Sequence, residues 1–298
     1  MRNASQIQSS RSDRIIDLIV SVAICVFLFL TIYPLIFVIS ASFSSPMEVF
    51  AGKMWLLPKG FTTEAYKLVF RNKDIFIGYR NTVLYTAIGT FINVAMTMLG
   101  AYPLSRKKMY GRNMFMAYFT FTMFFSGGLI PTYLIIKSLG LYNTFWVMVI
   151  PGAVSVYNMI VARTYMQTTI SEELYEAASI DGCSDGPAFF RIVLPLSAPI
   201  IAVLTLFYAV GHWNSYFNGL IYLGDRNRYP LQLILREILL SNMTGDMTEM
   251  LETDINKFLV SESLKYAVII VSCLPMLVLY PFLQRFFIKG IMIGAIKG

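Results

Sequence analysis

The chain has 298 residues, of which 56% are hydrophobic and 14% are charged, and its mean hydropathy is +0.62. Soluble domains are about 45–50% apolar and roughly 25% charged, so this composition excludes an ordinary soluble protein. The formal net charge is +7. A membrane protein needs basic residues near its faces for orientation, and a basic pI alone is a weak reason to infer DNA binding. We therefore expect no nucleic-acid partner.

The charged residues are segregated along the chain. Asp, Glu, Lys and Arg are absent from six windows, at 18–47, 81–105, 113–136, 138–162, 192–224 and 266–284. Each window can hold the roughly 20 apolar residues that a helix needs to cross the hydrocarbon core. The windows do not show the alternating segments of about ten residues that are typical of barrel strands. The sequence therefore predicts an all-α integral membrane protein with six transmembrane helices.

The expected domain map follows from these windows. We expect a polar N-terminal segment over 1–14, a transmembrane domain over 15–288 and a short basic tail over 289–298. Two long outer loops are expected, at 41–78 and 224–265. The spans are placed at about 17–40, 81–104, 113–136, 196–223 and 266–287, with the fourth running from a short loop at 137–142 to about Arg163.

Two local patterns refine this map. Thr62–Phe70, in the first outer loop, reads as a short amphipathic helix on which Ala65, Leu68 and Val69 share a face. Gly127-Gly128 interrupts the third span. Such breaks are tolerated inside a bundle because neighbouring groups satisfy the freed backbone atoms.

The turn between the second and third spans indicates the orientation. It carries four basic residues and no acidic one, at Arg106, Lys107, Lys108 and Arg112. The 24 Lys and Arg residues divide equally between the two faces, so the tally alone decides nothing. Short loops near the spans carry the positive-inside rule, however. We therefore expect both termini in the cytoplasm.

A polar stretch rich in small residues, 172–199, lies between two apolar runs. Ser171 is a good N-cap, and the acids that follow it suit the positive end of a helix. Gly182 can end this helix by taking the left-handed C′ position. We predict a helix, a turn and a second short helix at the membrane surface, with Leu174, Ala177 and Ala178 on one face. An interfacial loop without a partner is the alternative on physical grounds alone.

This stretch resembles the Glu-Ala-Ala loop of ATP-binding-cassette import permeases. Glu176-Ala177-Ala178 is followed after three residues by Gly182, and after nine more by Ile192-x-Leu194-Pro195. The longer sugar-permease form, Glu-Ala-Ala-x-x-Asp-Gly-Ala, is met except that Cys183 replaces the last alanine.

Other segments extend the resemblance over nearly the whole chain. The tail 287–298 looks like the end of the second permease subunit of maltose-type importers. Asn81-Thr82 and 212–217 look like the polysaccharide branch of that family.

The resemblance implies the type I importer permease fold, with a coupling helix in a cytoplasmic loop at 166–195, between the fourth and fifth spans. It implies a bacterial cytoplasmic membrane protein that pairs with a second, homologous permease subunit. A cytoplasmic ATPase dimer would use ATP and Mg, and an extracytoplasmic solute-binding protein would deliver an oligosaccharide, with acidic polysaccharide fragments left open. The coupling surface implied by the motif comprises Glu173, Glu176, Ala177, Ala178, Asp181, Gly182, Leu194 and Pro195.

The sequence carries no sign of its own catalysis. It has no Gly-x-x-x-x-Gly-Lys-Ser/Thr loop to hold phosphates, and its only histidine, His212, excludes a His-cluster zinc site. We therefore expect a non-catalytic subunit without a bound cofactor or metal. An ion-driven secondary sugar carrier is the alternative function. It would need ionisable residues within the spans, and the six windows contain only His212.

The fifth span holds the candidate sugar path. Sugars are bound by aromatic faces and hydrogen-bonding side chains, and polar groups inside a membrane face a cavity or a partner helix. The candidates on this span are Tyr208, His212, Trp213, Asn214, Tyr216, Phe217 and Asn218. Asn93 and Thr97, four residues apart on the second span, are weaker candidates. Packing against the partner permease is the alternative role for the cluster on the fifth span, and a hydrogen-bonded position within the span is the alternative for His212. Arg226 and Arg228, in the second outer loop, could meet an acidic sugar.

Overall fold

The computed structural model describes residues 11–241 and 263–281. All regular elements among these residues are helical, which confirms the all-α class. The chain divides into two compact units, Met1–Arg71 with Ser241–Val271 and Asn72–Leu240 with Ser272–Gly298, and each is described separately. The predicted tail at 289–298 and its resemblance over 287–298 lie outside the described residues.

The first unit contains α1 (Arg11–Ser42), α2 (Pro46–Phe50) and α3 (Glu64–Arg71). The most apolar window of α1 has no buried residue, as expected for a helix that meets lipid. At its C-terminal end, Ser44 Oγ donates to the Ser40 carbonyl at 2.7 Å and accepts from the Lys59 amide at 3.1 Å. The predicted amphipathic helix is confirmed as α3, which buries Ala65 and Val69, whereas Leu68, expected on the same face, is exposed.

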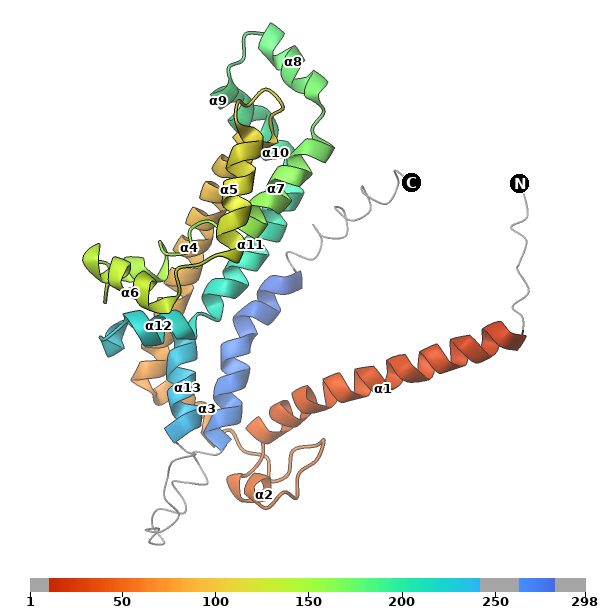
Figure 1. The fold of residues 1–298 in the computed structure, drawn as a ribbon. Coiled ribbons are helices and arrows are strands. Elements are labelled where there is room, and N and C mark those ends of the chain that lie inside the picture. The colour runs from red at the N-terminus through yellow and green to blue at the C-terminus, as the bar shows by residue number, and fades with distance from the viewer. Residues whose placement is uncertain (1–10, 242–262, 282–298) are drawn as a thin grey trace. The chain divides into compact units, whose positions relative to one another are not determined.

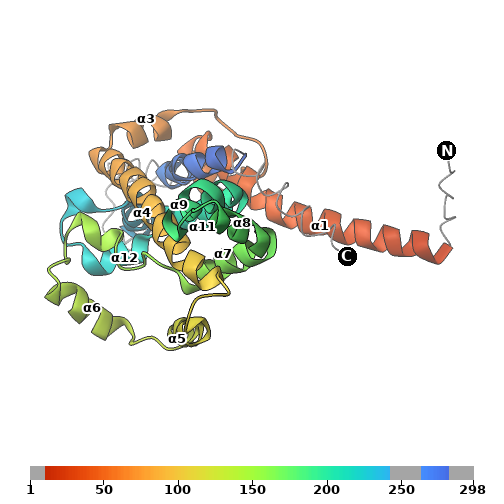
Figure 2. The same cartoon turned by 90° about the horizontal axis from the view of Figure 1, so that it is seen from above.

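The second unit is built on α4 (Lys73–Ser105), which packs along α7 (Val156–Thr169) and α11 (Ala198–Trp213). Figure 1 shows these helices side by side, and they cluster again in the end-on view of Figure 2. Ala101 on α4 and Ala162 on α7 are fully buried. Small residues let the helix backbones approach closely, which is how helices associate when lipid supplies no hydrophobic drive.

The second span begins earlier than the charge-free window predicts. α4 starts at Lys73 because the Asn72 side chain caps it, accepting from the amides of Asp74 and Ile75 at 2.9 and 3.4 Å. Charged residues are tolerated in this first turn because it can lie beyond the hydrocarbon core. A charge-free window therefore marks the buried part of a span and not the whole helix.

Two of the expected spans are broken. α5 (Arg112–Phe124) and α6 (Leu129–Ser138) are bent by 110° at the predicted glycine pair, where Gly128 has a φ of +84°. Only glycine takes such a backbone readily. The expected fifth span at 196–223 is wrong as a single helix. It is divided into α11 and α12 (Tyr216–Tyr222), because the Asn214 side chain and backbone both bond the Val210 carbonyl.

The span count of six remains a prediction. Among the described residues, three helices are long and apolar enough to cross a membrane. The number is five if two bent pairs, Arg112–Phe124 with Leu129–Ser138 and Asp185–Leu196 with Ala198–Trp213, each count as one span. In the fourth window the structure has α7, of 14 residues, preceded by a 3₁₀ turn at Phe145–Met148. Gly140 and Asn143, both with positive φ, prevent a continuous helix before it.

Candidate functional sites

The helix predicted in the polar stretch is α8 (Glu172–Ile180), at one end of the second unit (Figure 1). Gly182 takes the predicted left-handed position, with a φ of +76°. The Gly182 amide donates to the Ser179 carbonyl at 3.1 Å, and the Cys183 amide to the Ala178 carbonyl at 2.8 Å. This pair of bonds is a Schellman motif, which ends the helix sharply. Ser171 occupies the N-cap position without a side-chain cap bond.

The exposed face of α8 differs from the predicted one. Tyr175 and Ala178 are buried against their own chain, whereas Ala177 is exposed. Adjacent helical positions point about 100° apart, so two neighbouring alanines do not share a face. Glu173, Glu176 and Asp181 are exposed as well. Ile180 is 85% exposed, and sequence reasoning missed it because it occupies a variable position of the family motif.

Side chains at the end of α4 hold α8 in place. Arg106 Nη1 lies 3.4 Å from Glu172 Oε1, and the Arg106 guanidinium carbon lies 3.4 Å from the centre of the Tyr175 ring. Tyr102 Oη donates to the Asp185 carbonyl at 3.2 Å. Burial raises the pKa of the Tyr175 phenol, which therefore stays a neutral donor. Sequence reasoning also missed these anchors, because they join segments far apart in the chain.

The second helix of the stretch continues toward α11 in short pieces. α9 (Asp185–Ala188) leads into a π-helical turn at Phe189–Val193 and then into α10 (Leu194–Leu196). Phe189 and Val193 are buried, whereas Leu194 is half-buried and Pro195 is exposed. Pro195 has no N–H to donate, so regular α-helical bonding cannot pass through it. The end of the motif therefore anchors the loop, and its first helix presents the exposed face.

The candidate sugar-path residues separate into two groups. Five of them are bonded inside the protein. Asn93 Oδ1 lies 2.6 Å from His212 Nε2, and Asn93 Nδ2 donates to the Gly152 carbonyl at 2.8 Å. The hydroxyls of Thr97 and Tyr208 lie 2.6 Å apart, and Trp213 Nε1 donates to the Ser272 carbonyl at 3.0 Å. These contacts join α4, the segment before α7, α11 and the helix Ser263–Pro281.

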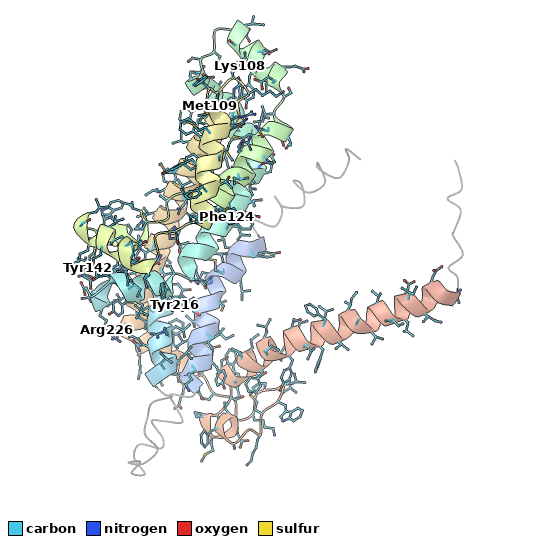
Figure 3. The ribbon with its side chains drawn as sticks, viewed as in Figure 1. Lys108, Met109, Phe124, Tyr142, Tyr216 and Arg226 are labelled. Atoms are coloured by element: carbon cyan, nitrogen blue, oxygen red, sulfur yellow. The ribbon has the colours of Figure 1, made fainter. Side chains whose placement is uncertain are left out.

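The other four candidates are exposed at the junction of α11 and α12, where Figure 3 labels Tyr216. They are Asn214, Tyr216, Phe217 and Asn218. A cavity of about 190 Å³ lies beside this junction, and its wall includes Asn93, Tyr208, His212 and Asn218. The structure thus brings three bonded candidates and one exposed candidate, Asn218, together around this cavity. Its wall does not include Thr97, Asn214, Tyr216 or Phe217, and Trp213 lines a different, apolar cavity.

The arginines of the second outer loop are paired with acids. Arg226 Nε bonds Asp74 Oδ2 at 2.9 Å, and Arg226 Nη1 lies 3.2 Å from Glu237 Oε2. The bond to Asp74 raises the pKa of Arg226 further above its ordinary value. Arg228 Nε lies 3.6 Å from Asp225 Oδ2. The predicted role in meeting an acidic sugar therefore competes with these ion pairs.

Side chains of α4 also hold the turn at Arg226–Arg228. Asn81 Nδ2 donates to the carbonyls of Asn227 and Tyr229 at 2.8 and 3.1 Å. Tyr85 Oη donates to the Arg228 carbonyl at 2.8 Å.

Within 11–241 and 263–281, no group of three or more His, Cys, Asp or Glu side chains could hold a metal ion.

Tyr208→Phe should destabilise the protein even without sugar. The change removes the bond to Thr97 and leaves the Ser155 amide, which donates to Tyr208 Oη at 3.2 Å, without its acceptor. Losing buried partners of this kind costs about 1–3 kcal/mol. Thermal unfolding of the purified chain in detergent measures the loss. Tyr216→Phe, at an exposed position, is the control. Equal unfolding midpoints with weaker sugar uptake would instead make Tyr208 a sugar contact.

Known proteins match this chain over nearly its full length. Residues 4–293 match the family described as the binding-protein-dependent transport system inner membrane component. The polygalacturonan/rhamnogalacturonan transport system permease protein YtcP of Bacillus subtilis is 40% identical over 96% of this chain and 99% of its own length. Protein LplC of the same organism is 38% identical over the full length of both chains.

A solved structure shares the fold. It is described as a bacterial ABC transporter involved in the import of the acidic polysaccharide alginate, and it matches with a TM-score of 0.85 and 32% identity, over 93% of this chain and 98% of that chain. Chains of this kind are membrane permease subunits, and a separate subunit hydrolyses ATP. The chain therefore belongs to the family of binding-protein-dependent transport system inner membrane components.

Proposed function

We propose that the chain is one of two permease subunits of an ATP-driven importer that carries oligosaccharides across the bacterial cytoplasmic membrane. The observation that carries the proposal is the family match over residues 4–293. A relative is named for polygalacturonan and rhamnogalacturonan, and a structural neighbour for alginate, which favours fragments of acidic polysaccharides. Family membership overturns the alternative of an ion-driven secondary carrier.

The same family match supports a set of protein partners for this chain. A second, homologous permease completes the path, and a solute-binding protein delivers the sugar from outside. A cytoplasmic ATPase dimer uses ATP and Mg, and this chain needs no cofactor of its own. Both termini lie in the cytoplasm, because the short turn at 106–112 is strongly basic.

Six crossings fit the described helices. Three single helices and two bent pairs account for five, and α7 with the irregular segment before it would form the sixth. Irregular backbone is tolerated at membrane depth only where protein or a cavity surrounds it. Val147, Met148 and Val149 in this segment are buried, which meets that condition.

The exposed face of α8 is the proposed docking surface for the ATPase. Glu173, Glu176, Ala177 and Ile180 make it up, and Asp181 and Gly182 fix where it ends. Ala178 and Leu194 belong to the same motif but pack against the rest of the chain and so hold the loop in place. Pro195, also in the motif, is exposed and interrupts the helical hydrogen bonding.

The exposed side chains at the α11–α12 junction are the proposed sugar path. Tyr216 and Phe217 offer aromatic faces, and Asn214 and Asn218 offer hydrogen bonds. Asn93, Thr97, Tyr208 and His212 shape the wall behind them through their internal bonds, whereas Trp213 acts in packing.

The transport proposal is tested in vesicles with the assembled complex. The ATPase rate should rise when the binding protein is loaded with oligogalacturonate, and uptake should stop on ATP depletion but survive an uncoupler. Neutral oligosaccharides of the same length are the control for substrate class. Uptake that persists without ATP and stops with the uncoupler would contradict the proposal.

Ala177 and Ala178 give a matched test of the docking surface. Ala177→Trp should leave the unfolding midpoint unchanged, because the position is exposed, but lower the affinity for the ATPase about tenfold, a change of roughly 1.4 kcal/mol. Ala178→Trp should instead lower the unfolding midpoint, since overpacking a buried site costs about 1–3 kcal/mol. Co-purification and thermal unfolding separate the two effects. Normal ATPase binding by Ala177→Trp would remove this face from the interface.

Gly182 should be required because of its backbone conformation, and not because a larger side chain would lack room. A Cβ atom there would meet nothing within 4 Å, but a φ of +76° costs most L residues about 1–2 kcal/mol. Gly182→Val should therefore uncouple ATP hydrolysis from uptake, whereas Gly182→Asn should retain most coupling, because asparagine tolerates this conformation. Gly186→Ala, with open space and no positive φ, is the control. Full coupling in Gly182→Val would show that the turn is dispensable.

A further inference from the structure

A basic cavity lies between α8, the proposed docking helix, and the turn at 106–111 that follows α4. Its volume is about 370 Å³, which is room for about ten water molecules. The ends of α4 and α7, the start of α5 and the start of α8 enclose it. Figure 3 labels Lys108 and Met109 in the same turn, near α8 and α9.

The charge of the cavity wall is strongly positive. Lys107, Arg112 and Arg163 line it, and the one acidic residue in the wall is Glu172. Glu172 already faces Arg106 at 3.4 Å, so the three lining cations have no acid of their own in the wall. Like charges held this close repel one another unless an anion lies among them.

An unused hydrogen-bond donor lies at the same place. The Tyr175 side chain lines the cavity and is only 7% exposed, and its hydroxyl has no hydrogen-bond partner among the described residues. Arg106 Nη1, on the guanidinium that stacks on the Tyr175 ring, has the Glu172 carboxylate as its ion-pair partner. Buried polar groups are rarely left without partners, so the Tyr175 hydroxyl calls for a ligand or ion. This hydroxyl can donate a hydrogen bond, and the missing partner is an acceptor.

The position of the cavity indicates the source of that acceptor. The turn at 106–111 directly follows Ser105, the last residue of a helix that is long and apolar enough to cross the membrane. The cavity therefore lies at the level of the lipid headgroups. Basic pockets between transmembrane helices on the cytoplasmic side bind anionic lipid headgroups, and a phosphate offers several strong acceptor oxygens.

We propose that this cavity binds the phosphate group of an anionic membrane lipid. Lys107, Arg112 and Arg163 supply the charge, and Tyr175 donates a hydrogen bond. The bound phosphate links the 106–112 turn to the start of α8, and so fixes the docking helix against the membrane surface. The binding step is independent of the proposed function, whereas its effect on coupling rests on the proposed role of α8.

The test compares two neighbouring lysines. Lys107 lines the cavity, whereas Lys108 is exposed on the same turn and does not. The full complex is purified from membranes that contain phosphatidylglycerol, and retained lipid is counted by native mass spectrometry. Lys107→Gln should weaken retention about fivefold or more, and Lys108→Gln should leave it nearly unchanged. Equal effects of the two changes mean diffuse attraction to an anionic surface and overturn the site.

Further arms separate the possible sources of the anion. Thermal unfolding in neutral lipid with added inorganic phosphate should show no stabilisation. A midpoint that rises in the wild type but not in Lys107→Gln would assign the cavity to a free anion. Loss of the ATPase from Lys107→Gln with unchanged lipid retention would assign it to an acidic side chain of that subunit. Either result overturns the lipid proposal.

The readouts also separate this inference from the transport proposal. Lipid retention requires neither sugar nor ATP. Lipid retained through Lys107 by a complex that imports no oligosaccharide would sink the transport proposal alone. Normal ATP-driven import with no lipid retained by the wild type would sink this inference alone. Lys107 is exposed, so its replacement should not disturb folding, and an unchanged unfolding midpoint checks this point.

Discussion

The second unit depends on one constraint: polar groups on an apolar helix must find partners within the protein. α4 carries such groups along its whole length, and three of them are satisfied by three different segments. Near its start, Asn81 holds the Arg226–Arg228 turn; in its middle, Asn93 holds His212; at its end, Arg106 holds α8. Leaving a polar group unpaired in lipid costs several kcal/mol, so these contacts determine which segments lie beside the start, the middle and the end of α4. Small buried residues of α4, Gly89 and Ala101, then allow α7 and α11 to pack closely.

This arrangement places the proposed docking surface, the proposed sugar path and the Arg226–Arg228 turn along one helix. A helix of 33 residues is about 50 Å long, so α4 reaches from the outer turn to the docking helix. The cavity beside His212 lies between them. Arg106 and Tyr102 connect the end of α4 to α8 and α9, and Asn93 and Thr97 of the same helix bond His212 and Tyr208. The contacts thus supply a continuous physical connection between the proposed docking surface and the proposed path.

The features that depend on local chemistry could be predicted from the sequence. Gly182 and Gly128 mark their turns because their backbone conformations exclude most other residues. It did not foresee the division at Asn214, where a side chain competes for a helical carbonyl. It also could not assign roles to the polar residues of the fifth span. Asn93 and His212 are 119 positions apart, and only the folded chain shows that they are partners. Ile180 was missed because the motif gave no reason to examine it.

The exposed apolar residues of this chain have two different explanations, and Ile180 belongs to the second. Along α1, exposed apolar side chains are what lipid requires. Ile180 is 85% exposed, but it shares its helix with Glu172, Glu173 and Glu176, and carboxylates are too costly in the membrane for this face to enter lipid. A large apolar side chain in water beside exposed acids fits a protein partner that offers an apolar pocket with basic residues around it. That complementarity is what the proposed docking surface demands of the ATPase.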